Sequence, residues 1–199
     1  MLVDDLFQLT TYHHQREHSP IMRECSRYLV ESNHQPLYKV LPRSYSDIHK
    51  VKVRFKNVGN KLSTAFNQAF EQDIYNLTKR AVFTSPSIPS VIEEDMDLFY
   101  IIPVDGYKFL YSKEVKNSNT DYASVLDTLV ETFEDNAEAI DVLTQLLKYS
   151  YITTELQEGI AANAEIILHG IPYYYAIRVS AYPDYSILLN NINNNIRTY

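Results

Sequence analysis

Three segments of the sequence place polar side chains at the ends of apolar, strand-like runs. PLYK follows a predicted helix and ends in Lys39, and RAVFTS ends in the two hydroxyl residues Thr84 and Ser85. In NAEIIL, which comes just after a polar loop, Glu165 opens an apolar strand. Side chains on rigid elements can point into a cleft and hold a ligand there. Each segment also has an ordinary structural interpretation, because polar residues often end strands in turns or stand exposed beside them.

A run of alternating basic residues, HKVKVRFK, is a further candidate. One face carries Lys50, Lys52, Arg54 and Lys56, and the other carries Val51, Val53 and Phe55. This period of two predicts a half-buried strand at about residues 48–56. Its basic face suits an anionic partner: phosphate, nucleic acid or an acidic protein. A solvated strand face, or an edge strand that its lysines protect from aggregation, is the commoner origin of such a pattern.

Two other patterns favour structural interpretations. The run HQREH, residues 14–18, matches a zinc-peptidase pattern that needs an uninterrupted helix. Ser19 and Pro20 begin a new helix directly after it and no third ligand is evident, so we expect no metal site. Cys25 lies in an apolar helix stripe, which predicts a buried structural thiol. The sequence contains no Walker A loop, G-x-G-x-x-G or G-x-S-x-G motif.

The length and charge of the chain limit the class of protein to which it can belong. With 199 residues, 45% hydrophobic and 22% charged, the chain is long enough for one well-buried domain. The formal net charge of -7 hides a split, with seven basic residues against one acid between Leu37 and Lys61, and sixteen acids against four bases between Glu93 and Glu165. One cysteine, an acidic N-terminus and no long apolar run predict a soluble protein of a reducing compartment, without signal peptide or membrane partner.

The elements expected to position these residues are helices and strands in mixed order. Helices are predicted from Pro20, over 61–80, over 121–133 and 136–149, and briefly within 153–163. Strands are predicted at 37–41, 48–56 and 81–84, and in two hairpins that turn at Asp105-Gly106 and about Gly170. We therefore expect a single α+β domain over 1–199. Its parts are a helical segment (1–36), a basic first half (37–116), an acidic helical insertion (117–150), the second hairpin (151–185) and an asparagine-rich tail (186–199).

In chain order, the three polar segments resemble the arginine, serine-threonine and glutamate strands of the ADP-ribosyltransferases. The chain is most similar to small ADP-ribosyltransferase-like proteins of tailed bacteriophages. The similar pieces are PLYK, KRAVFTS, LFYIIPVDGYKFLYSKEV and ELQEGIAANAEIILHGIPYYYAIR, which together touch most of the chain from Pro36 to Arg178. The resemblance implies a split, antiparallel-rich β-sheet with NAD, the substrate, held in a cleft between its two halves.

The resemblance also implies roles for the polar residues. Glu165 would orient the nicotinamide ribose and stabilise its developing positive charge, and Thr84 and Ser85 would hold the glutamate and the ribose. The family usually has Arg-Gly in its first strand, where this chain has Lys39-Val40. Lysine offers a point charge instead of a bidentate fork to the dinucleotide phosphates, and Arg43 lies close enough in sequence to substitute.

Aromatic and amide residues complete the implied site. Phe99, Tyr100, Tyr107 and Phe109 are candidates to stack on nicotinamide, although alternation sends half of them into the core. Residues 153–163, with Gln157 and Asn163, would recognise the acceptor. Arginine-modifying family members have Glu or Gln at the position of Asn163, so another acceptor, or hydrolysis of NAD alone, stays open.

Two functions follow as expectations. The first is a phage-encoded mono-ADP-ribosyltransferase that modifies a host macromolecule in the host cytoplasm. The alternative is a non-catalytic phage protein that binds a host factor, a defence protein or a neighbouring virion subunit through its charged surfaces. A nucleic-acid target for the basic strand is a third possibility, and it predicts an affinity that falls steeply with salt.

Overall fold

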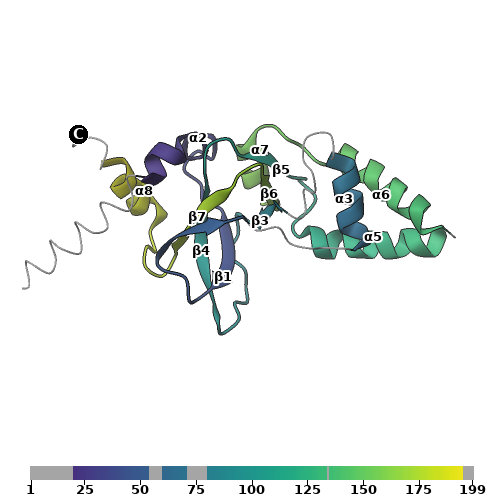
Figure 1. The fold of residues 1–199 in the computed structure, drawn as a ribbon, viewed down its shortest axis with the longest axis horizontal. Helices are drawn as coiled ribbons and strands as arrows, with labels where there is room; N and C mark the ends of the chain where they lie inside the picture. The colour runs from purple at the N-terminus through teal and green to yellow at the C-terminus, as the bar shows by residue number, and fades with distance from the viewer. Residues whose placement is uncertain (1–19, 54–59, 71–79, 134, 195–199) are drawn as a thin grey trace, which may run out of the picture. The chain divides into compact units, whose positions relative to one another are not determined.

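The computed structural model describes residues 20–53, 60–70, 80–133 and 135–194. Contacts divide the chain into two compact, interleaved units. The first comprises residues 1–51, 88–105 and 173–199, and the second comprises residues 52–87 and 106–172. Helices and antiparallel strands are mixed along the chain (Figure 1), which confirms the α+β class. A single domain over the whole chain stays a prediction.

The first unit is built around a four-stranded sheet. Its order is β1 (Tyr38–Pro42), β4 (Met96–Pro103), β7 (Tyr173–Arg178) and β2 (Ile48–Lys52). Strand β4 runs antiparallel to both β1 and β7. Its side chains from Leu98 onward are buried on both faces, which is why this strand reads as a continuous apolar run, LFYIIP, instead of an alternating one.

The helices of the first unit are residues 20–24, α2 (Ser26–Glu31) and α8 (Tyr185–Asn194). The predicted apolar stripe is confirmed, since Ile21, Cys25, Tyr28 and Leu29 are buried. The Sγ atom of Cys25 lies 4.0 Å from the carbonyl oxygen of Ile102 in β4. Burial raises the pKa of this thiol, which agrees with a structural cysteine. Residues 14–19, including the HQREH run and the Ser19 cap, lie outside the described residues.

The second unit contains a three-stranded antiparallel sheet and a group of helices. The sheet order is β3 (Val82–Thr84), β6 (Ile166–His169) and β5 (Lys108–Leu110). The helices are α3 (Lys61–Phe70), α5 (Ser118–Thr132), α6 (Asn136–Ser150) and α7 (Leu156–Ala161). The two acidic helices are thus confirmed, and the helix predicted over 61–80 is confirmed as far as Phe70, beyond which residues 71–79 lie outside the described part.

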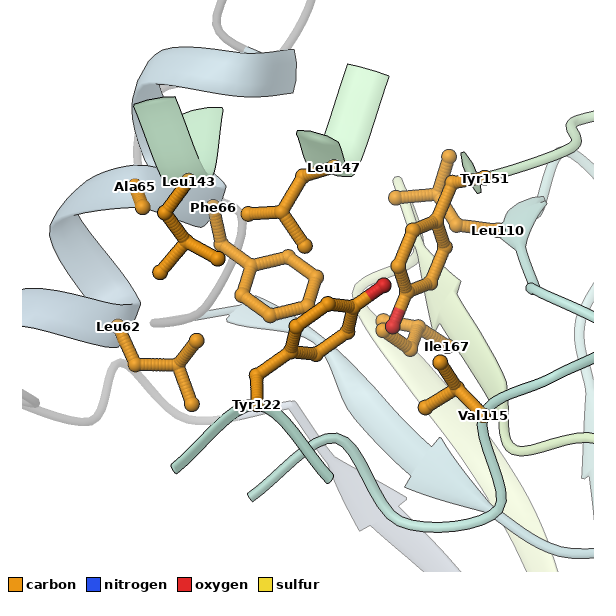
Figure 2. Packing of buried hydrophobic residues seen from close by; sticks show 10 residues of the cluster. All are labelled: Leu62, Ala65, Phe66, Leu110, Val115, Tyr122, Leu143, Leu147, Tyr151 and Ile167. Carbon is orange, nitrogen blue, oxygen red and sulfur yellow. The ribbon is translucent and has the colours of Figure 1, made fainter. Parts of the chain in front are cut away.

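The core of the second unit joins these helices to the sheet. Helices α3 and α5 both pack against α6. Figure 2 shows the aromatic rings that fill the space, with the centroid of Phe66 6.1 Å from that of Tyr122 and 5.5 Å from that of Tyr151. The cluster is completed by Leu62, Ala65, Leu110, Val115, Leu143, Leu147 and Ile167. The acidic helices are therefore part of a hydrophobic core and their charges lie on its outside.

Both predicted hairpins are wrong as hairpins. The strands on either side of Asp105-Gly106 are β4 and β5, and those on either side of Gly170 are β6 and β7. In each case the two strands belong to different sheets, so the turn carries the chain from one sheet to the other. Gly106 and Gly170 do have positive φ angles, of 92° and 76°, as tight turns require. The two glycine turns are therefore confirmed. The strands beside each turn do not pair with each other, because each pairs with strands that are distant in sequence.

Candidate functional site

Strands β3 and β6 bring two of the predicted catalytic segments together. Their antiparallel register pairs Thr84 with Ile166, the residue directly after Glu165. The Thr84 hydroxyl donates a hydrogen bond of 2.8 Å to the Ile166 carbonyl and is buried. The segment that ends in Thr84 and Ser85 and the segment that begins with Glu165 therefore lie side by side at one end of this strand pair.

Glu165 is buried, with 9% of its surface exposed. Its Oε2 accepts a hydrogen bond of 2.9 Å from the backbone N–H of Ser118, the first residue of α5. Its own backbone N–H donates to the Val115 carbonyl at 3.0 Å. The first N–H groups of a helix have no partner within the helix and attract negative charge. The carboxylate is thus held at the positive end of the acidic helical insertion.

The sequence around Asn117 explains why α5 begins beside Glu165. The Asn117 side chain accepts hydrogen bonds from the backbone N–H groups of Asn119 and Thr120, as an N-cap does. The Asp121 carboxylate reaches back to accept from the N–H groups of Asn117 and Lys116, at 3.0 and 2.8 Å. These bonds lower the pKa of the Asp121 carboxyl.

The core tyrosines lie near the same carboxylate. Burial raises the pKa of Tyr151, and negative charge on Tyr122 and Glu165 acts in the same direction. The Tyr122 hydroxyl shares a hydrogen bond of 3.0 Å with the Ser150 hydroxyl. Glu165 therefore lies close enough to the buried Tyr151 for its charge to contribute to raising the pKa of that side chain.

Asn163 and two serines lie at the end of the strand pair, where Asn163 and Ser87 are exposed and Ser85 is half-buried. The Ser87 hydroxyl donates a hydrogen bond to Oδ1 of Asn163, and the Ser85 hydroxyl accepts one of 3.0 Å from the Ser87 backbone N–H. Asn163 has a φ of 54°, in the left-handed region that asparagine tolerates. Ser85 thus closes a local turn, and Ser87, which the sequence interpretation missed, contacts the predicted acceptor residue.

The predicted acceptor segment is short and mostly exposed. It contains α7, on which Gln157 is exposed. Lys113 pairs with Glu158 at 2.5 Å, which raises the pKa of the lysine and contributes to lowering that of Glu158. The Lys116 ammonium donates to the Ala162 carbonyl, next to Asn163. Lys116 is a cation that the sequence interpretation did not associate with this segment.

The predicted nicotinamide-stacking residues are buried. Tyr107 and Phe109, in the second unit, are 0% and 6% exposed, with ring centroids 6.2 Å apart. Phe99 and Tyr100, in the first unit, are 0% and 2% exposed. Alternation predicted that half of these four rings would lie outside the core, and this prediction is wrong. In β4 the reason is that both faces of the strand are covered.

Lys39 and Arg43 lie on the first unit, at β1 and just after it. Lys39 is half-buried and stands opposite Phe99 in the β1–β4 register. Arg43 is exposed, and its backbone N–H donates to the Asp95 carbonyl at 2.9 Å. Its guanidinium donates to the Met96 carbonyl at 3.4 Å. The predicted phosphate-binding residues thus share a unit with Phe99, whereas Thr84, Ser85 and Glu165 belong to the other unit.

Arg178 is a largely buried cation that the sequence interpretation did not single out. Its Nε pairs with Asp47 at 2.8 Å, its Nη1 pairs with Asp97, and its Nη2 donates to the Arg43 carbonyl at 3.0 Å. The guanidinium carbon lies 4.9 Å from the centroid of the Phe99 ring. With 12% of its side chain exposed, Arg178 lies over Phe99 and links β7 to β4 and to the segment between β1 and β2.

The basic strand is partly used within the protein. Lys50 pairs with Glu24 at 3.4 Å and lies 3.7 Å from the centroid of the Tyr173 ring. The same Glu24 oxygen accepts hydrogen bonds of 2.8 Å from the hydroxyls of Tyr175 and Tyr173, and these bonds lower the pKa of the carboxyl. Lys52 is exposed on β2. Arg54 and Lys56 lie outside the described residues, so the four-residue basic face stays a prediction.

Over the described ranges, no group of three His, Cys, Asp or Glu side chains is arranged to hold a metal ion. Among the described helices, none has the length and apolar character needed to span a membrane. No family model, curated protein or solved structure matches this chain.

Proposed function

We propose that this chain is a phage-encoded, ADP-ribosyltransferase-like protein that transfers ADP-ribose from NAD to a host macromolecule. The observation that carries the proposal is the β3–β6 register, which pairs Thr84 with the residue after Glu165. Sequence order alone does not require these two segments to be neighbours. Their adjacency is what a hydroxyl segment and a carboxylate need in order to act on one ribose.

Each residue has a definite task in this proposal. The bond between the ribose C1′ of NAD and nicotinamide breaks, with the electron pair leaving on nicotinamide, and a nucleophilic atom of the acceptor bonds to C1′ and releases its proton to solvent. Glu165 orients the ribose and stabilises the positive charge that develops on it. Ser87 is exposed and Ser85 half-buried at the end of the β3–β6 pair, and both hydroxyls contact a polar substrate, while the exposed Asn163 and Gln157 contact the acceptor. Lys39 and Arg43 bind the dinucleotide phosphates.

The test is incubation of the protein with labelled NAD and host lysate, measuring transferred label and released nicotinamide. We expect Glu165→Gln to lower both by about a hundredfold or more, the range seen when an electrostatic stabiliser is removed. Glu114→Gln is the matched control, because Glu114 is exposed and the chemical change is the same. If folded wild-type protein neither transfers label nor releases nicotinamide, the proposal is wrong.

A specific observation favours the second function, a binding protein without turnover. The Glu165 carboxylate and the Thr84 hydroxyl both have hydrogen-bond partners inside the protein, Ser118 and Ile166. These hydrogen bonds can by themselves explain why a carboxylate and a hydroxyl are buried at these positions, without any catalytic role. In that case charge reversal of Lys50, Lys52, Arg54 and Lys56 abolishes capture of a purified partner, while Glu165→Gln leaves it unchanged. The opposite pattern would remove this function.

A further inference from the structure

The first backbone N–H of α5 is used on Glu165. The Ser118 N–H donates a hydrogen bond of 2.9 Å to Oε2 of Glu165. Ser118 is the first residue of the helix, so its N–H has no carbonyl partner within α5. Both residues are buried, with 1% and 9% of their surface exposed. The contact is therefore shielded from water, where a hydrogen bond to a charged group is strongest.

The segment that leads into α5 also holds the backbone of Glu165. The Glu165 N–H donates to the carbonyl of Val115, which lies three residues before Ser118, at 3.0 Å. The Lys116 ammonium donates to the Ala162 carbonyl, so the same segment also holds the chain that leads into β6. The main chain and the carboxylate of Glu165 are therefore both fixed by the start of α5.

Local side chains in turn fix the position of the Ser118 N–H. Asn117 accepts hydrogen bonds of 3.0 and 3.4 Å from the N–H groups of the two residues that follow Ser118. Asp121 accepts hydrogen bonds of 2.8 and 3.0 Å from the N–H groups of the two residues that precede Ser118. The start of the helix, and with it the donor to Glu165, is thus built before any substrate is bound.

We propose that Ser118 is a positioning residue, whose N–H holds the Glu165 carboxylate in the orientation that transfer of ADP-ribose requires. This inference rests on the proposed function. A carboxylate stabilises developing positive charge best when it is already in place, since reorienting it during the reaction costs free energy. A glutamate side chain has several rotatable bonds, and the Ser118 N–H restricts them. Ser118 acts through Glu165 and contacts no part of NAD.

The test is the rate of nicotinamide release at saturating NAD, measured on the folded full chain. Ser118→Pro deletes the N–H, and we expect kcat to fall about tenfold or more, as when a hydrogen bond to a charged group is lost. Ser118→Ala keeps the N–H, and its kcat should match that of wild type. The affinity for NAD in titration calorimetry should be unchanged in both variants. A contact with a structural role alone would lower the stability of Ser118→Pro but not the kcat of its folded fraction.

Helix α6 provides matched controls, because it also begins after an extended N-cap residue, Asp135. Asn136→Pro repeats the proline change at its first residue, and we expect kcat to be unchanged. If circular dichroism shows that Ser118→Pro does not fold, Asn117→Gly takes its place, since it loosens the start of α5 but keeps the N–H, at little cost in stability. We expect the kcat of Asn117→Gly to fall about threefold or more, and that of Asp135→Gly, the equivalent change in α6, to match wild type.

The outcomes separate this inference from the function on which it rests. Wild-type protein that releases no nicotinamide overturns both. If wild type is active, a folded Ser118→Pro that is equally active overturns the inference alone, as does an equal loss in Ser118→Ala or a loss that lies in NAD affinity instead of kcat. Where Ser118→Pro is unfolded, equal rates for Asn117→Gly and Asp135→Gly overturn it.

Discussion

At the scale of single residues, the predicted catalytic groups are also structural groups. A carboxylate taken out of water is stable only when donors replace the water, and Glu165 finds one in the N–H of Ser118. The Thr84 hydroxyl likewise donates its hydrogen bond to the Ile166 carbonyl, on the strand with which Thr84 pairs. Sequence could identify the residue types and their positions at strand ends. It could not identify Ser118, because a backbone N–H has no signature in the sequence beyond the helix cap that precedes it.

Ser118→Pro tests the Glu165 contact with little other change. Proline is favoured at the first position of a helix, and the extended Asn117 before it, with φ -150° and ψ 106°, accommodates a following proline. The variant removes the N–H that donates to Glu165 and also the buried Ser118 hydroxyl, and Ser118→Ala removes the hydroxyl alone. We expect a loss of about 1–3 kcal/mol in the free energy of unfolding, measured in urea, and a smaller loss for Ser118→Ala, which keeps the N–H. Equal losses would contradict the contact.

Cys25 gives a prediction about reactivity. Its side chain is fully buried, and burial raises the pKa of the thiol, so little thiolate exists at neutral pH. We expect a thiol reagent to label the native protein at pH 7 far more slowly than the urea-unfolded protein. Rapid labelling of the native protein would show that Cys25 is accessible and that its helix is packed differently.

Glu24 gives a prediction about pH. Hydrogen bonds from Tyr175 and Tyr173 lower the pKa of this carboxyl below its ordinary value of 4.5. A group whose pKa is lower in the folded state stabilises the fold above its unfolded pKa, and this contribution is lost as the pH falls through the folded value. Stability should therefore decline below about pH 4.5, and less steeply in Glu24→Gln than in wild type. Identical pH dependence of urea unfolding would contradict this.

At the scale of elements, the short helix α7 is placed by close packing. A Cβ on Gly159 would lie 2.7 Å from Cγ of Tyr111 and 2.9 Å from Cδ1 of Ile166. Both of these side chains are fully buried. Gly159→Ala, which normally strengthens a helix, is therefore expected to destabilise the protein by about 1–3 kcal/mol in thermal or urea unfolding. Ala161→Gly serves as the control; a gain in stability for Gly159→Ala would contradict the packing.

The elements also show which parts of the fold can be predicted from the sequence. Periodicity located the helices and strands because a buried face repeats at 3.6 or 2 residues whatever lies against it. The two glycine turns were recognised for the same local reason. What failed was the pairing: β4 uses both edges on β1 and β7, and β5 pairs with β6. Those partners are far away in sequence, so no local pattern distinguishes a hairpin from a crossing between sheets.

At the scale of the whole molecule, the predicted site residues are divided between the two units. Lys39, Arg43 and Phe99 belong to the first, and Thr84, Ser85 and Glu165 belong to the second. The sequence predicted which residues belong together only through a family resemblance, whereas the structure pairs the strand that ends in Thr84 with the strand that directly follows Glu165. The proposed function requires that the chain bind NAD, and a purely binding role does not.

Equilibrium binding of NAD to the full chain tests this requirement most directly. Titration calorimetry should show saturable binding that Lys39→Gln weakens by about tenfold, the loss of a charged phosphate contact. Lys52→Gln is the matched control, because Lys52 is an exposed base on β2 and has no part in the proposed site. The account predicts binding that depends on Lys39 and not on Lys52. Absence of saturable binding, or equal losses in the two variants, would contradict it.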